Sequence, residues 1–179
     1  LQPNKVFQYF EEICAIPHGS RNLQQISDYL VDFAKVHGLK YRQDEDLNVI
    51  IWKDGSKGYE DSDPVILQGH RDMVAVQEAD CKKDMEKEGL DLEIDGDYIL
   101  AKGTSLGGDD GIAVAYTLAV LDDEEMAHPP IEAIFTVNEE IGMLGAATID
   151  VSDLKGRLFM NMDSEDEGVF TVSCAGGAS

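Results

Sequence analysis

Three short apolar runs, at residues 64–68, 131–137 and 158–162, constrain the fold of this chain more than any other feature. Each run has the length of a β-strand, and none shows the regular polar alternation of a half-exposed strand. Strands that are apolar throughout are typical of parallel sheets covered by helices on both faces. The runs therefore predict an α/β fold, with a mixed, mostly parallel sheet flanked by helices.

The segment before the first run carries helical signals. Residues 4–13 place apolar side chains at i, i+3, i+4 and i+7, which predicts an amphipathic helix. A second helix is expected at about residues 21–37. Ser20 can cap its first turn, and Gly38 lies where a glycine often follows the last turn.

The remaining segments predict shorter elements. A hairpin is expected at residues 92–100, where two triplets with apolar residues flank an Asp-Gly-Asp turn. Helices are expected at residues 112–121 and 144–148, and strands at residues 48–52 and 169–173.

The charge of the chain excludes two classes of partner. Its 14 basic and 36 acidic residues give a formal net charge of −22. Nucleic acids and anionic membranes both bind basic surfaces, so neither is expected as a partner. No stretch approaches the roughly 18 consecutive apolar residues that a membrane-spanning helix needs. With 179 residues, 43% of them hydrophobic, the chain can bury the core of one domain.

The cysteines and the amino terminus indicate a cellular compartment. Cys14, Cys81 and Cys174 are odd in number and include no C-x-x-C pair, which favours reduced thiols. The first residues also lack the apolar segment of a signal peptide. We therefore expect a cytoplasmic protein.

Polar side chains follow each of the three apolar runs. In α/β sheets, ligands gather at the carboxyl ends of the parallel strands, so these side chains are expected to meet. They are His70 and Asp72 after the first run, Glu139 and Glu140 after the second, Asp163 after the third, and Asp109 and Asp110 in the glycine-rich turn before the helix at residues 112–121.

Such a cluster predicts a metal centre. Several carboxylates at one place repel one another unless cations lie among them. A histidine mixed with carboxylates suits Zn²⁺, Mn²⁺ or Co²⁺ better than Ca²⁺, which prefers oxygen ligands alone. The acids outnumber the three protein ligands of one catalytic zinc, so two ions about 3.5–4 Å apart are expected.

Each of these residues also has an ordinary explanation when taken alone. His70 and Asp72 could form a solvated surface pair, and Asp110 could cap the following helix. Glu139 and Glu140 could lie in a solvated loop, and Asp163 belongs to a strongly acidic run. The joint pattern favours the metal centre over these separate explanations.

Four motifs resemble a known family. They are residues 68–74 (QGHRDMV), 102–112 (KGTSLGGDDGI), 138–143 (NEEIGM) and 161–168 (NMDSEDEG). In this order they are similar to motifs of the Xaa-His dipeptidases, which are bacterial relatives of the aminoacylase and carboxypeptidase G metallopeptidases. The resemblance implies the phosphorylase/hydrolase-like fold of a zinc-peptidase catalytic domain. It also implies hydrolysis of dipeptides, notably carnosine-type Xaa-His substrates, by a zinc-bound bridging water.

The resemblance further implies a role for each matching residue. Two zinc ions are expected, with Co²⁺ or Mn²⁺ as alternatives, and so is a cis peptide bond between Asp109 and Asp110. In these roles His70 and Asp163 would bind one ion, Glu140 would bind the second, and Asp109 would bridge both. Asp72 would orient His70, and Glu139 would be the general base.

The chain departs from the family pattern in three ways. Arg71 stands where a smaller or apolar residue is expected, and it could pair with Asp72 and weaken the hold of Asp72 on His70. Asp110 replaces the commoner asparagine. The last ligand of the second zinc is a histidine far down the family's chain, and none of His18, His37 and His128 matches it.

This missing ligand leads to an expectation about the whole protein. Residues 1–179 would be the N-terminal part of the catalytic domain, without the lid and dimerisation domain or the C-terminal part, and would be inactive, or nearly so, alone. The full-length protein is expected to be a homodimer. Alternatives are a non-catalytic binding protein with the metallopeptidase fold, an aminoacylase- or tripeptidase-type hydrolase, and an acidic structural domain whose carboxylates never meet.

Overall fold

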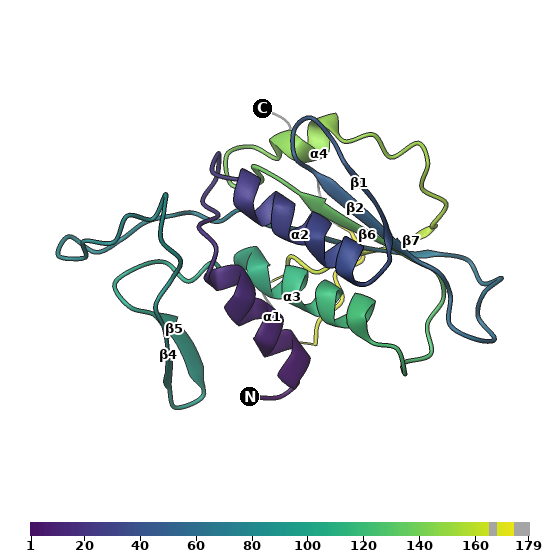
Figure 1. Cartoon of the computed structure of the whole chain (residues 1–179), viewed down its shortest axis with the longest axis horizontal. Helices are drawn as coiled ribbons and strands as arrows, with labels where there is room; N and C mark the ends of the chain where they lie inside the picture. The colour runs from purple at the N-terminus through teal and green to yellow at the C-terminus, as the bar shows by residue number, and fades with distance from the viewer. Residues whose placement is uncertain (165–167, 174–179) are drawn as a thin grey trace.

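A computed structural model describes residues 1–164 and 168–173, and its main feature is a five-stranded sheet flanked by helices (Figure 1). The order of strands is β1-β2-β6-β3-β7. The strands are β1 (Lys40–Gln43), β2 (Val49–Lys53), β3 (Val65–His70), β6 (Ile131–Thr136) and β7 (Leu158–Asn161).

The predicted mixed, mostly parallel sheet is confirmed. Strand β3 pairs in parallel with β6 on one side and with β7 on the other. Strand β2 is antiparallel to both β6 and β1. Four of the five strands therefore run in the same direction, and β2 alone runs in the opposite one.

The helices cover the sheet unequally. On one face lie α1 (Asn4–Cys14), α2 (Gln24–Val36) and α3 (Gly108–Asp122), as Figure 1 shows. The ring of Tyr9 on α1 packs edge-on against Phe33 of α2, with 5.6 Å between the ring centroids.

A smaller apolar cluster covers the opposite face of the sheet. Ile50, Ile66 and Ile134 point to this face, because neighbouring residues of a strand alternate between faces. Ile149 and Leu154, which follow α4 (Leu144–Thr148), pack against them. Ile134 and Ile149 of this smaller apolar cluster line the same pocket as Glu139 and Asp163.

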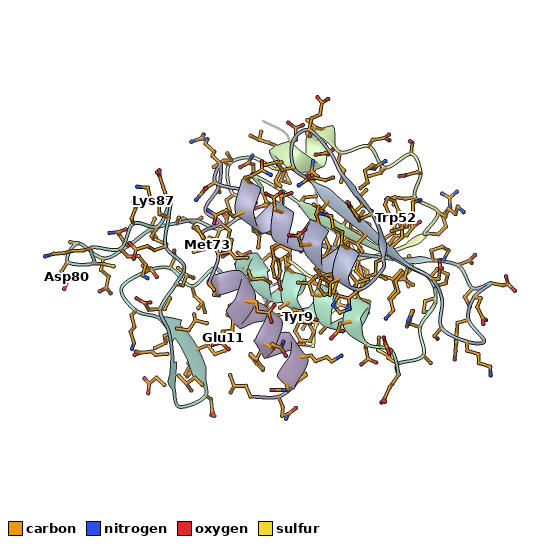
Figure 2. The ribbon with its side chains drawn as sticks, in the orientation of Figure 1. Tyr9, Glu11, Trp52, Met73, Asp80 and Lys87 are labelled. Carbon is orange, nitrogen blue, oxygen red and sulfur yellow. The ribbon has the colours of Figure 1, made fainter. Side chains whose placement is uncertain are left out.

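The segment between β3 and α3 extends from the body of the molecule. It contains the predicted hairpin, formed by β4 (Leu92–Asp95) and β5 (Tyr98–Ala101), which is a separate two-stranded sheet. Asp80 lies near the tip of the loop that precedes the hairpin (Figure 2). Within the described residues, no helix has the length and apolar character needed to cross a membrane.

Several local predictions need correction. Strand β1 has no counterpart among the predicted elements, and residues 169–173 form no strand. Leu23, and not Ser20, occupies the N-cap of α2, where no side chain makes a capping bond. Gly38 has a φ of +64° directly after the helix, as predicted.

Candidate metal centre

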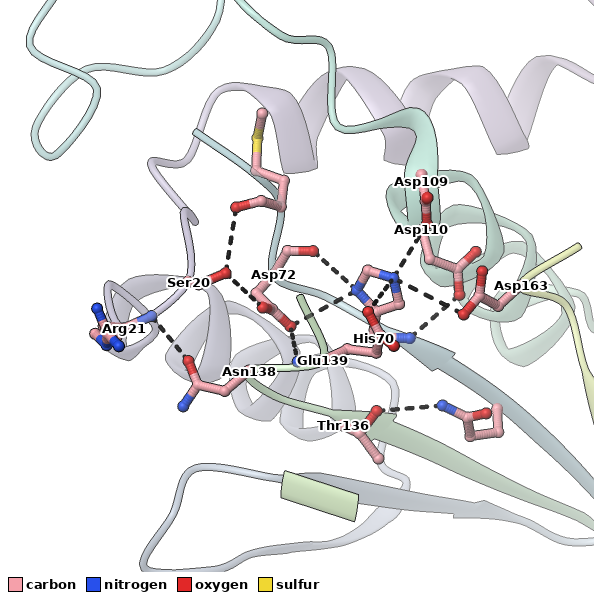
Figure 3. Close-up of polar contacts among 12 residues, drawn as sticks. Ser20, Arg21, His70, Asp72, Asp109, Asp110, Thr136, Asn138, Glu139 and Asp163 are labelled. Atoms are coloured by element: carbon pink, nitrogen blue, oxygen red, sulfur yellow. Dashed lines mark hydrogen bonds and ion pairs between the residues drawn. The ribbon is translucent and has the colours of Figure 1, made fainter. Parts of the chain in front are cut away.

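His70 lies at the centre of the candidate site, at the carboxyl end of β3 (Figure 3). Its ring is buried, and three carboxylates from three other segments surround Nε2. Nε2 lies 3.1 Å from Oδ1 of Asp109, 3.8 Å from Oε2 of Glu139 and 4.0 Å from Oδ2 of Asp163. The predicted meeting of the strand ends is therefore present in the structure.

The other ring nitrogen of His70 faces Asp72. Nδ1 lies 2.9 Å from the carbonyl oxygen of Asp72 and 3.6 Å from its Oδ1 atom. Both oxygens accept hydrogen bonds, so Nδ1 carries a proton in this arrangement. In a neutral ring, Nε2 would then present its lone pair to the carboxylate side, as a metal ligand must.

The carboxylate of Asp72 is fixed by two further donors. Oδ1 accepts a bond of 3.0 Å from the backbone N–H of Glu139, and Oδ2 accepts one of 2.8 Å from the hydroxyl of Ser20 (Figure 3). Burial raises the pKa of Asp72, but the bonds with His70, Glu139 and Ser20 lower it more, so the net pKa lies below its ordinary value. Asp72 is therefore held as a carboxylate.

Asp109 and Asp110 lie at the start of α3, where their backbone angles are not helical. The peptide bond between them is cis, as the family resemblance implies. Oδ2 of Asp110 accepts a bond of 3.2 Å from the backbone N–H of His70, so this buried side chain joins the site and does not merely cap the helix. A Cβ atom on Gly69 would lie 2.7 Å from the same oxygen, which explains the glycine.

The donor atoms form two overlapping groups with metal-like spacing. His70, Asp109 and Glu140 form one group, and His70, Asp110 and Asp163 form the other. Within each group the ligand atoms lie within 4.8 Å of one another. One imidazole among several carboxylates is a donor set that Zn²⁺, Mn²⁺ and Co²⁺ accept, so the residues present fit such an ion.

The electrostatics of the cluster also favour a cation. Burial, together with the charge of Asp163, raises the pKa of Asp110 to about 7. Burial likewise raises the pKa of Glu140, with Asp109 and Glu139 adding to the effect against the influence of His70. These shifts reflect negative charges that are crowded and partly desolvated, which a bound cation would relieve.

Arg71 behaves differently from the prediction. Its side chain is fully buried, but it donates to the carbonyl oxygen of Leu47 and forms no ion pair with Asp72 in the part of the chain that the structure describes. Burial lowers the pKa of Arg71 to about 9, and the charge of Asp72 offsets part of that effect.

The seven residues that the sequence predicts to meet therefore come together, and Ser20 joins them. The sequence offers no local signal for Ser20, because its partner Asp72 lies 52 residues away. His18, His37 and His128 remain outside the two described donor groups. His18 contacts the carbonyl oxygen of Ile16, His37 faces Asp122, and His128 contacts the carbonyl oxygen of Pro129.

An α/β domain with a histidine and carboxylates at the carboxyl edge of its sheet defines a candidate metallohydrolase domain. No family model matches the chain. The chain is 40% identical over 177 residues to the cytosol non-specific dipeptidase of Escherichia coli (strain K12), covering 99% of this chain and 36% of that protein.

Two solved structures resemble this chain in fold, and one of them is also named as a dipeptidase. The aminoacylhistidine dipeptidase from Vibrio alginolyticus superposes with a TM-score of 0.91 at 41% identity, over 94% of this chain and 34% of that one. A tripeptidase from Staphylococcus aureus, at 23% identity and a TM-score of 0.75, shares the fold over 90% of this chain and 43% of its own. The resemblance to Xaa-His dipeptidases is thus confirmed in sequence and fold. The chain spans about a third of the length of the two dipeptidases.

Proposed function

We propose that this chain carries the metal centre of a metal-dependent dipeptidase. The observation that carries the proposal is the convergence of carboxylates from three segments on the Nε2 atom of the buried His70. The similarity to two proteins named as dipeptidases supports hydrolysis of a peptide bond as the reaction. The name of the Vibrio relative, an aminoacylhistidine dipeptidase, supports Xaa-His dipeptides as substrates.

Two zinc ions are the proposed cofactor, with Co²⁺ or Mn²⁺ as alternatives. The two donor groups contain more carboxylates than one zinc ion uses, which supports a pair of ions. His70 and Asp163 would hold one ion, Glu140 the other, and Asp109 both. When bound, zinc supplies Lewis-acid chemistry, lowering the pKa of a water molecule and polarising the carbonyl group.

Glu139 is the proposed general base. Its carboxylate lies near the cluster, and its side chain is 32% exposed, so water and substrate can reach it. Glu139 would take a proton from the attacking water and pass it to the nitrogen of the leaving amine. The bond from its backbone N–H to Asp72 fixes the start of this loop beside His70.

The whole protein is proposed to contain more than this domain. The relatives are much longer than this chain. We propose that the whole protein adds a lid and dimerisation domain and a further histidine ligand. Together these would complete the site in a homodimer. A cytoplasmic location is supported by the name of the Escherichia coli relative, a cytosol dipeptidase.

The test is a peptidase assay of the full-length natural protein. β-Alanylhistidine, glycylhistidine and a tripeptide are incubated with the protein before and after treatment with a chelator. We expect hydrolysis of the two histidine dipeptides, loss of activity on chelation and recovery with added zinc. Absence of hydrolysis in zinc-loaded protein would favour a non-catalytic binding protein, and a clear preference for the tripeptide would favour a tripeptidase.

A further inference from the structure

Arg71 has the largest fully buried side chain among the described residues, and the proposed reaction does not use it. It lies between His70 and Asp72 in the sequence, so its side chain points to the opposite side from theirs. Its backbone N–H extends the pairing of β3 with β6 by donating to the carbonyl oxygen of Thr136 at 3.2 Å. A shift of Arg71 would therefore move the backbone that carries both site residues.

The guanidinium of Arg71 has few partners for a buried charge. Its Nη2 atom donates to the carbonyl oxygen of Leu47, whereas Nε and Nη1 have no hydrogen-bond partner in the part of the chain that the structure describes. A buried cation with unpaired donors is less favourable for folding than an apolar side chain of similar size. Stability alone therefore does not explain this arginine.

Leu47 belongs to the turn between β1 and β2, residues 44–48, which we call the β1–β2 turn. The carboxylate of Asp44 closes the turn by accepting bonds of 2.8 Å from the backbone N–H and the side-chain amide of Asn48. Leu47 has a φ of +75°, a conformation uncommon outside glycine. Its carbonyl oxygen accepts a second bond, of 2.9 Å, from the buried hydroxyl of Ser27 on α2. The turn is thus fixed both to α2 and to the end of β3.

The β1–β2 turn also reaches the segment that carries Glu139 and Glu140. The side-chain amide of the buried Asn48 donates to the carbonyl oxygen of Gly145 in α4 at 3.3 Å. A Cβ atom on Gly145 would collide with Oδ1 of Asn48, so this close approach requires glycine. The backbone N–H of Gly145 donates to the carbonyl oxygen of Val137 at 2.9 Å, which closes the loop that holds the two glutamates. One turn therefore contacts both the end of β3 and the base of this loop.

We propose that Arg71 is a positioning residue, which together with Asn48 makes the β1–β2 turn a connection that fixes the end of β3 relative to the loop of Glu139. The proposal rests on the metal centre proposed above. His70 lies on one connected segment and Glu139 on the other, with 3.8 Å between Nε2 and Oε2. The bond from the backbone N–H of Glu139 to Asp72 joins the same segments directly, and the turn adds a second connection.

Arg71→Met, made in the full-length protein, removes the guanidinium and retains a long, unbranched side chain. Zinc affinity, measured by competition with a chelator, should fall about tenfold, the lower end of the loss usual when a hydrogen-bond partner of a metal ligand is removed. The free energy of unfolding of the zinc-free protein should stay equal or rise, because an incompletely paired buried charge is lost. A merely structural arginine would lower stability and zinc affinity together.

Arg42→Met is the matched control. Arg42 also donates to a backbone carbonyl oxygen, that of Asp150, and pairs with Asp153 at 3.0 Å. None of these residues belongs to the two described donor groups. The zinc affinity of this variant should equal that of the parent.

A double-mutant cycle tests whether Arg71 and Asn48 act through the same turn. Asn48→Ala removes the side-chain bonds to Asp44 and Gly145, and it should also weaken zinc binding. If both residues act through the β1–β2 turn, the double variant should bind zinc about as well as the weaker single variant. Residues that act independently would instead show losses that multiply.

The contrary outcomes separate the connection from the reaction. The role of Arg71 is overturned if zinc affinity in Arg71→Met is unchanged, or if the losses multiply in the double variant. A rise in zinc affinity would also overturn it, since the buried charge would then act only by repelling the ions. A zinc-binding protein that loses affinity in Arg71→Met as expected, but hydrolyses none of the histidine dipeptides, would support the connection and overturn the proposed function.

Discussion

The Nδ1 atom of His70 lies 2.9 Å from the backbone carbonyl oxygen of Asp72, closer than its 3.6 Å separation from the Oδ1 atom of the same residue. The backbone of Asp72 therefore contributes to the orientation of the imidazole ring. The carboxylate also has two other partners, the backbone N–H of Glu139 and the hydroxyl of Ser20. Asp72 thus links the histidine to the loop that carries the proposed base.

The first prediction concerns this link. Asp72→Ala removes the carboxylate but retains the carbonyl oxygen that also contacts His70. Zinc affinity should therefore fall about tenfold, at the lower end of the roughly 10–100-fold loss usual when the hydrogen-bond partner of a metal ligand is removed. The kcat should also fall, because the backbone of Glu139 loses its acceptor. Zinc titration and steady-state kinetics of the full-length protein measure both effects. Ser20→Ala, which removes only one of the bonds to the Asp72 carboxylate, should have a smaller effect. Unchanged affinity and kcat in Asp72→Ala would contradict the link.

The second prediction concerns Glu139. Glu139→Ala should lower kcat by about 10²–10⁴-fold, the usual contribution of a general base, while zinc content is retained. Glu139→Gln, which keeps the size of the side chain, should be similarly impaired because an amide cannot accept the proton. Kinetics and metal analysis of the same preparations test this. Near-normal turnover in either variant would refute the assigned role.

The third prediction concerns the close packing of β3 against the turn before α3. A methyl group on Gly69 would lie 2.7 Å from Oδ2 of Asp110 and 2.9 Å from Cβ of Ala113. Gly69→Ala should therefore reduce the free energy of unfolding by about 1–3 kcal/mol, as overpacking does, and weaken zinc binding by displacing Asp110. Denaturant unfolding and zinc titration measure the two effects.

Gly108→Ala is the matched control for that substitution. The nearest atom to a Cβ at Gly108 is a side-chain carbon of Leu106 at 3.7 Å, an ordinary contact. The stability of this variant should lie within about 0.5 kcal/mol of the parent. Equal effects of the two substitutions would contradict the account of Gly69.

The fourth prediction concerns the reactivity of Cys14. Burial, with a contribution from Glu11, raises the pKa of the Cys14 thiol to about 12. Because the thiolate is the reactive form, iodoacetamide at pH 8 should modify Cys14 far more slowly than the partly exposed Cys81. Peptide mapping by mass spectrometry after timed labelling measures the two rates. Labelling of Cys14 as fast as Cys81 in the folded protein would contradict its burial.

The candidate site was more predictable from sequence than several details of the fold. His70, Glu139 and Asp163 follow apolar runs, and parallel strands bring their carboxyl ends to one edge, so the run boundaries alone predict that these residues meet. Strand β1 was missed because its residues, Lys40–Gln43, form a short, mostly polar edge strand without a periodic apolar signal.

Two other errors share a physical cause. Ser20 was expected to cap α2, and Arg71 was considered as a partner of Asp72. In the structure the hydroxyl of Ser20 donates to Asp72, and the guanidinium of Arg71 donates to the carbonyl oxygen of Leu47. Local patterns favour partners nearby in the chain, whereas packing of distant segments decides which partner a buried polar group finds.

The central claim is that the carboxylates around His70 hold metal ions, and metal analysis of the full-length protein tests it most directly. Protein exchanged into zinc and freed of excess metal should contain about two zinc ions per chain. His70→Ala and Asp109→Asn should each bind less zinc. Ala147→Leu, a control on α4 outside the two donor groups, should bind as much as the parent. Full-length protein that retains no zinc, or whose zinc content is unaffected by both site substitutions, would contradict the claim.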